Sequence, residues 1–280
     1  MTSQPTSSVG VSQLHADSQL HPVALFVATR WELAALRRAL PVVRQEHVGG
    51  VCCLVGQRAG REYWLIQTGV GPEAAQAAAG AVLNRQRMAL AVSAGFAGAL
   101  VPASIGDLVI GTSVSSAAYD GGWNQGTDSV SSAAAMVSGA QSVAVQLGIA
   151  ARIGPVVSVS QVVCRAEDKQ SLGRVTGALA LDMESAALAR VAQERAVPFM
   201  VLRTVSDLAG EDLPLDFNLF LKPPGWLKGI RDLIRHPSTV IGLNRLRRQS
   251  NLAADRLTAV CALYAGAGFG LSPAPERGMT

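Results

Sequence analysis

The stretch from Ala178 to Gly210, ALALDMESAALARVAQERAVPFMVLRTVSDLAG, contains two polar segments that each follow a short apolar run. The first run ends at Asp182-Met183-Glu184 and leads into an alanine-rich helical pattern that a proline stops. The second run, Phe199 to Leu202, has the composition of a buried strand and leads to Ser206-Asp207. This succession of strand, helix and strand predicts an α/β fold.

Glu184 and Asp207 are the candidate functional residues of this stretch. If the two strands are parallel neighbours, both carboxylates emerge at the carboxyl edge of the sheet, where open α/β sheets bind ligands. Their separation, 207 − 184 = 23 residues, corresponds to about one helix plus one strand. The same residues also fit structural roles, as a first-turn carboxylate favoured by the helix dipole and as a loop cap.

The strings DMESAALA and VLRTVSD, in this order and at this spacing, resemble the nucleoside phosphorylase and nucleosidase superfamily. That group includes methylthioadenosine/S-adenosylhomocysteine nucleosidases and purine nucleoside phosphorylases. The resemblance implies a three-layer single α/β domain, with a central mixed, mostly parallel sheet flanked by helices. It also implies that Met183 and Glu184 hold the ribose. At the Ser206-Asp207 motif, the Asp207 carboxyl would protonate the purine.

The composition is that of a globular enzyme. The chain has 280 residues, 49% of them hydrophobic, which is enough for a sizeable core. The net charge of +4 comes mostly from residues after 221, so no nucleic-acid partner is expected. The four cysteines lack metal-ligand spacing, so free thiols, no metal and a cytoplasmic location are expected. No apolar run reaches the length of a transmembrane helix.

Four segments are expected along the chain. Residues 1–21 are rich in Ser, Gln and Thr without the apolar region of a signal peptide, which predicts a disordered leader. Residues 22–221 form the catalytic domain. Residues 222–265 read as a basic amphipathic helical extension broken at His236-Pro237, and residues 266–280 as a flexible tail.

The basic extension allows two interpretations. Amphipathic helices rich in Arg and Lys bind anionic membrane surfaces, which predicts peripheral contact through residues 222–250 at the inner face of the membrane. Alternatively, the extension packs on the domain or on a partner subunit. We also expect the protein to form a homo-oligomer. A tail of this kind after DLPLDF (residues 212–217) resembles the hopanoid-associated phosphorylases, which act on adenosylhopane, a lipid-linked nucleoside.

The first strand places further polar residues at the same sheet edge. Val23 to Ala28 is a continuous apolar run, typical of a buried parallel strand, and Arg30 and Glu32 follow it directly. In the nucleosidases that the chain resembles, a glutamate at this place orients the attacking water, and Glu32 matches it. In the phosphorylases, basic residues nearby hold phosphate, a role that fits Arg30. A helix-start glutamate and a surface arginine are the structural alternatives.

A glycine turn opens the next helical pattern, at Thr68 to Ala74. Gly69 and Gly71 allow the backbone to approach a ligand, and amides at a helix N-terminus favour anions. The resemblance implies that this turn lines the side of the pocket that binds the ribose and the nucleophile, which is phosphate or water. The turn also matches the dinucleotide fingerprint, but the next acid after Glu73 is Asp107, too distant to bind a ribose.

Two further segments gain a role from the resemblance. Met88 to Ser93 is predicted as a strand that runs into a glycine-rich turn at Ala94 to Leu100, where the backbone amides of Ala97 and Gly98 contact the substrate. The strand from Ile153 to Val163 brings Val162 and the backbone of Val163 to the base.

The intervening segment, Ser113 to Gln141, is polar and weakly structured by pattern. Its only large side chains are Tyr119 and Trp123. They suit either contact with a bulky group of the substrate or a surface loop.

The expected activity is cleavage of the N-glycosidic bond of a 5′-substituted adenosine, releasing adenine, with adenosylhopane as the expected substrate. Asp207 would act as general acid and Glu184 would stabilise the positive sugar. Glu32 favours water as the nucleophile and Arg30 favours phosphate, and no other cofactor is expected. A methylthioadenosine/S-adenosylhomocysteine nucleosidase, a dinucleotide-binding reductase and an inactive binding protein are the alternatives. The absence of a G-x-S-x-G motif argues against a serine hydrolase.

Overall fold

The computed structural model describes residues 21–214 and 237–271. Several expected segments therefore lie outside the described residues. They are residues 1–20 of the leader, the end of the catalytic domain at 215–221, the first part of the extension at 222–236, and residues 272–280 of the tail.

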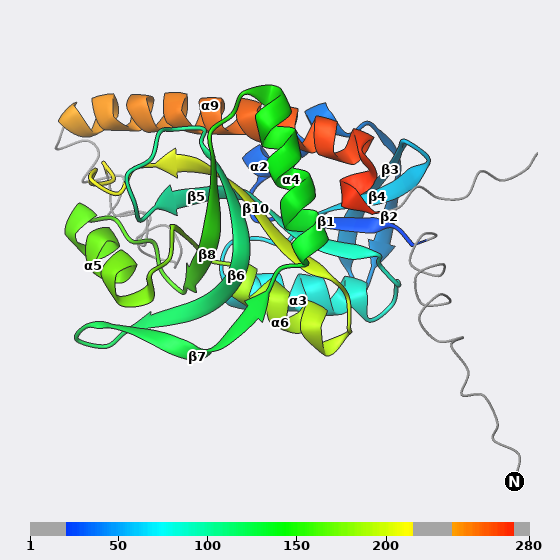
Figure 1. Ribbon diagram of the computed structural model, residues 1–280, viewed down its shortest axis with the longest axis horizontal. Helices are drawn as coiled ribbons and strands as arrows, with labels where there is room; N and C mark the ends of the chain where they lie inside the picture. Colours follow the sequence, from blue (N-terminus) through cyan, green and yellow to red (C-terminus); the bar gives the residue numbers. More distant parts are fainter. Residues whose placement is uncertain (1–20, 215–236, 272–280) are drawn as a thin grey trace, which may run out of the picture.

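One sheet of ten strands forms the centre of the described structure (Figure 1). The strands are β1 Val23–Val27, β2 Val42–Val48, β3 Val51–Arg58, β4 Arg61–Gln67, β5 Leu90–Ala99, β6 Leu108–Tyr119, β7 Trp123–Ser131, β8 Ala151–Val159, β9 Ala180–Asp182 and β10 Phe199–Asp207. Their order is β10-β6-β8-β9-β5-β1-β4-β3-β2, with β7 paired to β6. Because β10 also pairs with β5, five of the strands close into a ring and the other strands extend from it.

The sheet is mixed, as predicted. Parallel pairings join β1 to β4 and β5, β10 to β5, and β8 to β6 and β9. An equal number of pairings are antiparallel, so the sheet is not mostly parallel. The tight turns that link β2 to β3, β3 to β4 and β6 to β7 account for this difference, since a hairpin forces antiparallel pairing.

Helices cover both faces of the sheet. They are α2 Arg30–Ala39, α3 Pro72–Leu83, α4 Ala134–Leu147, α5 Ala166–Thr176, α6 Ser185–Glu194 and α9 Pro237–Gly266. Figure 1 shows α2, α4 and α9 on one side and α3 and α6 on the other, which confirms the three-layer fold class. The faces that α3 and α6 bury consist largely of alanine, whose small side chain lets these two helices pack closely.

The last helix, α9, belongs to the core of the domain over its C-terminal half. Leu257, Val260, Cys261 and Tyr264 are fully buried, at the i, i+3, i+4, i+7 spacing of one helix face. The helix packs on α2, α4 and β10. Within the described residues, no helix is long and apolar enough to cross a membrane.

The structure therefore places the end of the chain differently from the predicted segments 222–265 and 266–280. Past α9, residues 268–270 form a short 3₁₀ helix, and Phe269 is buried against the ring of Tyr264, 5.1 Å between centroids. The boundary between extension and domain falls inside α9. Of the exposed arginines of this helix, Arg245, Arg247 and Arg248 lie in its N-terminal half and Arg256 lies in its C-terminal half.

Two expectations about irregular segments are wrong. The glycine-rich stretch Ala94 to Leu100 is not a turn, because β5 continues through Ala99 and is paired with both β9 and β10 there. The segment Ser113 to Gln141 is regular, since it contains most of the β6–β7 hairpin and the start of α4. The polar residues of β7 are exposed on both faces of the strand, and polarity alone did not reveal the pairing.

Candidate functional site

The terminal segment of β5, from Gly95 to Gly98, lies at the centre of the candidate site. Parallel β10 lies on one side of it, with Asp207 opposite Gly98. Antiparallel β9 lies on the other side, with Leu181 opposite Gly98. The strands before Glu184 and Asp207 are thus not the parallel neighbours that the sequence suggested. The Asp207 carboxylate nevertheless lies against Gly98 of β5, and that of Glu184 lies 3.9 Å from Arg203, whose guanidinium approaches Gly95 of the same strand.

A buried arginine organises the first part of the site. The Arg203 guanidinium, on β10, is 1% exposed. Its nitrogen atoms lie 2.9 Å from the Asp182 carboxylate, 3.8 Å from that of Glu32 and 3.9 Å from that of Glu184. We call these four residues the arginine cluster. One cation thus faces three carboxylates, which leaves an excess of negative charge when all three are ionised.

Asp182 links the arginine cluster to the start of α6. Its Oδ1 accepts hydrogen bonds from the Ser158 hydroxyl at 2.5 Å and from the Glu184 and Ser185 amides at 3.2 and 3.1 Å. Its Oδ2 accepts from the Ser185 hydroxyl and from Arg203. Asp182 therefore fixes the turn that carries Glu184, and it has no lone pair left for a ligand.

Glu184 is a buried carboxylate at the N-terminus of α6. Its Oε1 accepts a hydrogen bond from the Gly71 amide at 2.8 Å. Burial raises the pKa of Glu184 to about 7, because desolvation and the charges of Asp182 and Glu32 outweigh the opposing effects of Arg203 and the Gly71 amide. Since Glu184 takes the amide at the start of α3, that amide is not free for the pyrophosphate of a dinucleotide.

Glu32 combines a structural and a potential chemical role. It forms a capping box with Thr29 at the start of α2, and its Oε2 accepts from the Ala28 amide, the Thr29 amide and the Thr29 hydroxyl. Its Oε1 accepts from the Phe96 amide at 2.8 Å. Each carboxylate oxygen has about two acceptor positions. Oε1 accepts the one bond from Phe96, so it retains a second position for a ligand or a water.

Gly95 permits the close approach of Glu32 and Arg203. A Cβ at this position would lie 2.2 Å from Glu32 Oε1 and 2.5 Å from Arg203 Nη1. Any other residue would therefore displace both charged groups.

An ion pair forms the second part of the site. Lys169 of α5 is fully buried, and its Nζ lies 2.5 Å from Asp207 Oδ1. Oδ2 of Asp207 lies 3.2 Å from the Ser206 hydroxyl, which also lies 3.4 Å from the Ala97 carbonyl. A Cβ on Gly98 would approach Asp207 Oδ1 to 2.9 Å, so the carboxylate lies directly on the backbone of β5. We call Lys169 and Asp207 the lysine pair.

The remaining predicted residues lie around these two groups. Met183 lines a pocket of about 430 Å³ between α6 and the β6–β7 hairpin. Val162 and Val163 line another, of about 400 Å³, together with Tyr119 and Trp123, whose rings meet edge to face at 5.2 Å. These pockets border the arginine cluster and the lysine pair through Met183 and through the start of α5, respectively.

The nucleophile residues separate into two groups. Gly71 contacts Glu184 directly, and Gly69 precedes it in the same turn with a positive φ of 87°. Arg30 does not join the cluster: it is exposed on the surface of α2, with its guanidinium 4.6 Å from the centre of the Trp31 ring. The structural alternative for Arg30, a surface arginine, is the one observed.

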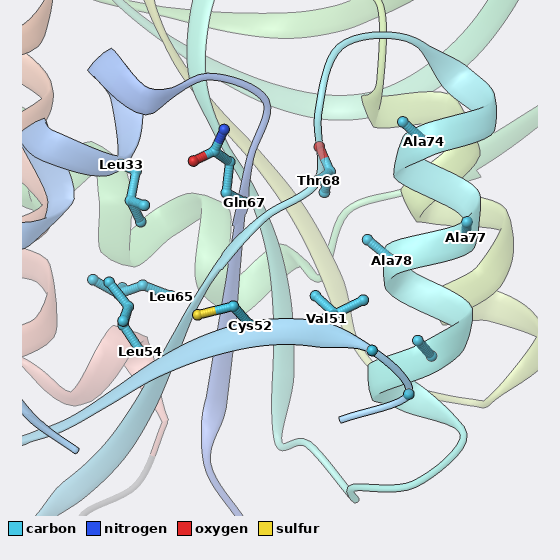
Figure 2. A pocket seen from close by; sticks show the side chains of 13 residues that line it. Leu33, Val51, Cys52, Leu54, Leu65, Gln67, Thr68, Ala74, Ala77 and Ala78 are labelled. Carbon is cyan, nitrogen blue, oxygen red and sulfur yellow. The ribbon is translucent and has the colours of Figure 1, made fainter. Parts of the chain in front are cut away.

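A hollow of about 610 Å³ is a separate apolar groove (Figure 2). Figure 2 shows it between α2 and α3, over the ends of β3 and β4, with Leu33, Leu54, Leu65 and Ala78 on its walls. No member of the arginine cluster or the lysine pair lines it. We therefore place the chemistry at the charged groups and not in this groove.

Sequence reasoning missed three residues of the site. Arg203 offered a signal, because a charge inside the apolar run FMVLRTV needs buried partners. Asp182 was noticed only as part of the motif. Lys169, in AEDKQ, looks like any polar residue of a surface helix, and only the fold brings it to Asp207. Among the described residues, no group of His, Cys, Asp and Glu could hold a metal ion.

Comparison with known proteins places this architecture in context. A family model described as the phosphorylase superfamily matches residues 22–222. The chain is 26% identical over 216 residues to the 5′-methylthioadenosine/S-adenosylhomocysteine nucleosidase of Shewanella baltica, covering 73% of this chain and 91% of that one. It is 28% identical over 214 residues to the nucleosidase of the same name from Shewanella loihica, covering 72% and 93%.

Solved structures show the same fold. The 5′-methylthioadenosine/S-adenosylhomocysteine nucleosidase of Neisseria meningitidis, in complex with methylthio-immucillin-A, aligns with a TM-score of 0.67 and 22% identity over 87% of this chain and 100% of that one. The futalosine hydrolase of Helicobacter pylori aligns with a TM-score of 0.65 and 20% identity, over 86% and 97%. At these identities the likeness establishes the fold alone.

Proposed function

We propose that this chain, an enzyme that belongs to the phosphorylase superfamily, breaks the N-glycosidic bond of a 5′-substituted adenosine and releases adenine. The observation that carries the proposal is that Glu184 and Asp207 each lie beside a buried cation that contacts the β5 or β10 side of the same site: Glu184 beside Arg203 of β10, and Asp207 beside Lys169 and against Gly98 of β5. Arg203 and Asp207 are four residues apart on β10, roughly 13 Å along an extended strand, which separates two ends of one elongated ligand.

The charges at the two ends suit this bond. When an N-glycosidic bond breaks, the sugar becomes positive and the departing base becomes negative. The arginine cluster has more carboxylates than cations, and such fixed negative charge stabilises a developing positive sugar. Asp207, at the other end, is placed to give a proton to the base as general acid.

Water is our proposed nucleophile. Glu32 Oε1 has an acceptor position left and lies in the arginine cluster, so it is suited to hold and orient a water. Phosphate, the alternative, would need cations of its own near Glu32. Arg30 is exposed beside Trp31, and Arg203 is already surrounded by three carboxylates.

The 5′ substituent is the finer part of the proposal. The curated relatives are named for 5′-methylthioadenosine, which favours a small thioether group. A lipid-linked nucleoside such as adenosylhopane is favoured by the position of the basic half of α9. Arg245 of this helix pairs with Glu211 and lines a small pocket together with Asp207, so the basic surface adjoins the site. We retain adenosylhopane as the proposed substrate, with 5′-methylthioadenosine as the second.

The proposed membrane contact, at the inner face of the membrane, uses the same surface. Arg247 and Arg248 are exposed beside Arg245, and exposed basic residues near a surface attract anionic lipids. Binding of the full chain to vesicles with and without phosphatidylserine tests this. We expect binding to the anionic vesicles that Arg247→Gln with Arg248→Gln weakens, and equal binding to both vesicle types would contradict it. The proposed homo-oligomer is tested by light scattering of the same sample.

The decisive assay uses both candidate substrates. The protein is incubated with adenosylhopane and with 5′-methylthioadenosine, each with and without phosphate, and the products are identified by mass. We expect free adenine and a sugar with a free anomeric hydroxyl, independent of phosphate. A sugar 1-phosphate would replace water by phosphate in the proposal, and no adenine from either substrate would contradict the proposal.

A further inference from the structure

We infer that Lys169 is a positioning residue for Asp207, which fixes the carboxyl and stabilises the carboxylate left when Asp207 gives its proton to the departing base. This inference rests on the proposed role of Asp207 as general acid. It adds a residue that the chain contributes from α5, away from both sequence motifs of the site.

The surroundings of Lys169 indicate that it is a charged ammonium. Its three N–H groups have three acceptors: Asp207 Oδ1 at 2.5 Å, the Leu208 carbonyl at 3.1 Å and the Glu211 carbonyl at 3.2 Å. An ammonium has three donors and no acceptor, so each N–H is satisfied. A fully buried lysine is rare unless it is paired, which is the case here.

The ion pair makes the two carboxyl oxygens of Asp207 unequal. Oδ1 is held by Lys169 and lies against the Cα of Gly98. In the described structure, the hydrogen bond that Oδ2 accepts comes from the Ser206 hydroxyl at 3.2 Å. Because Oδ1 is fixed, the carboxyl cannot rotate freely, and Oδ2 is the oxygen presented to a ligand.

The proton transfer can now be followed atom by atom. As the glycosidic bond breaks, its electron pair stays with the base, and the proton on Asp207 Oδ2 moves to a ring nitrogen of that base. The negative charge of the base thereby ends on Asp207, whose Oδ1 lies beside the Lys169 ammonium. A nearby cation stabilises a carboxylate, so Lys169 favours the product side of this step.

The same cation has an opposite effect before the reaction. Its removal should slow the reaction at low pH and also extend the activity to higher pH. A lysine that only supports the fold would produce the first effect without the second.

Other charged groups near the lysine pair are already engaged. Glu211 pairs with Arg245 of α9, and Gln249 donates to it at 3.3 Å. The Asp212 carboxylate accepts from the Ala166 amide at the start of α5. On α5 itself, Glu167 pairs with Arg165 and Asp168 lines the neighbouring pocket. Among the described residues, Asp207 forms its ion pair with Lys169.

The test compares pH profiles of adenine release from 5′-methylthioadenosine and adenosylhopane by the full-length wild type, Lys169→Met and Lys169→Arg. For Lys169→Met we expect kcat to fall about 10- to 100-fold at pH 6 with KM little changed, as part of the range that a general acid contributes. We expect its alkaline limb to move to higher pH. Lys169→Arg should restore the position of the wild-type limb.

Two controls separate the outcomes. Arg38→Met removes an exposed ion pair with Asp255 and should change neither kcat nor the limb. Lys169→Gln, which is uncharged but polar, replaces Lys169→Met if thermal unfolding shows that the latter is not folded, and we expect the same shift. An alkaline limb that does not move in folded, active Lys169 variants overturns the inference while leaving the proposed function intact. A wild type that releases no adenine from either substrate overturns both.

Discussion

The arginine cluster and the lysine pair are two buried charged groups with opposite balances. Arg203 faces three carboxylates, whereas Lys169 faces the single carboxylate of Asp207. Both cations are almost fully buried, so solvent screens neither group strongly. The arginine cluster thus holds more carboxylates than cations, whereas the lysine pair holds one of each. This difference matches the proposed polarisation of an N-glycosidic bond, in which the sugar becomes positive and the base negative.

The excess of carboxylates has a cost that appears in Glu184. Buried like charges raise one another's proton affinity, and the pKa of Glu184 rises to about 7. Near neutral pH the cluster therefore titrates.

The largest expected effect on the rate lies at the lysine pair. Asp207→Asn removes the acidic proton while keeping the size of the side chain, and we expect adenine release to fall about 10²- to 10⁴-fold. Initial rates at saturating substrate measure this. Asp212→Asn is the matched control, since Asp212 lines the same small pocket but its carboxylate accepts from the Ala166 amide at the start of α5. A rate of Asp207→Asn near that of wild type would remove the general acid.

The negative end should follow closely. Glu184→Gln retains an acceptor for the Gly71 amide but removes a negative charge from the arginine cluster. Losing one such electrostatic contact costs about 10²- to 10³-fold in kcat, and we expect a loss of that size. Glu194→Gln, at the exposed end of the same helix, should retain full activity. If both variants behaved alike, Glu184 would have no special role.

The pH dependence of the rate sharpens the comparison. The folded-state pKa of Glu184 is raised to about 7, so the fraction in the negative form decreases as the pH falls below that value. If the negative form stabilises the sugar, kcat of the wild type should decline towards low pH with a midpoint near 7. Glu184→Gln should lack this limb. The measurement is kcat from pH 5 to 8.5, and an unchanged acid limb in Glu184→Gln would assign it to another group.

A smaller effect concerns stability. The pKa of Glu184 is about 7 in the folded protein and 4.5 for an ordinary exposed glutamate. The stabilisation of the fold that comes from protonating Glu184 is therefore fully present below pH 4.5. This contribution is lost as the pH rises through about 7, and it amounts to about 3 kcal/mol at most. Relative to wild type, Glu184→Gln should therefore gain unfolding free energy between pH 4.5 and 8. Urea unfolding at both pH values measures it, and a constant difference would contradict the raised pKa.

The smallest effect is expected next to the lysine pair. Arg245 is a cation close to Asp207, but it pairs with Glu211 at the surface, and exposed ion pairs contribute little. Arg245→Met should change kcat for 5′-methylthioadenosine less than about threefold. Steady-state assays beside Lys169→Met decide this, because equal losses in the two variants would mean that the net charge of the region matters and not the lysine pair.

Much of the fold and part of the site could be predicted from the sequence. Apolar runs that end in Glu32, Glu184 and Asp207 located these carboxylates at strand ends, because buried strands are contiguous in sequence. The expected parallel pairing of β9 and β10 was wrong, since apolar composition does not specify strand direction. The strands that lead to Glu184 and Asp207 are still neighbours of one strand, because β5 lies between β9 and β10.

The cations were harder to predict for a physical reason. Arg203 and Lys169 are defined by partners 18 to 171 positions away, and a lysine in AEDKQ has no local feature that indicates burial. The place of the C-terminal half of α9 was left open between a membrane surface and packing on the domain. Its apolar positions are helical in period, but nothing local shows that they cover β10. Residues that act through distant contacts require the fold.

The most direct test of the account is a crystal structure of the protein with a 5′-methylthioadenosine analogue whose glycosidic linkage cannot be cleaved. We predict that the ribose hydroxyls contact Glu184 and that a ring nitrogen of the base lies within hydrogen-bonding distance of Asp207 Oδ2, with Lys169 still bound to Oδ1. A ligand that reached only one of the two carboxylates, or that occupied the apolar groove of Figure 2 instead, would contradict it.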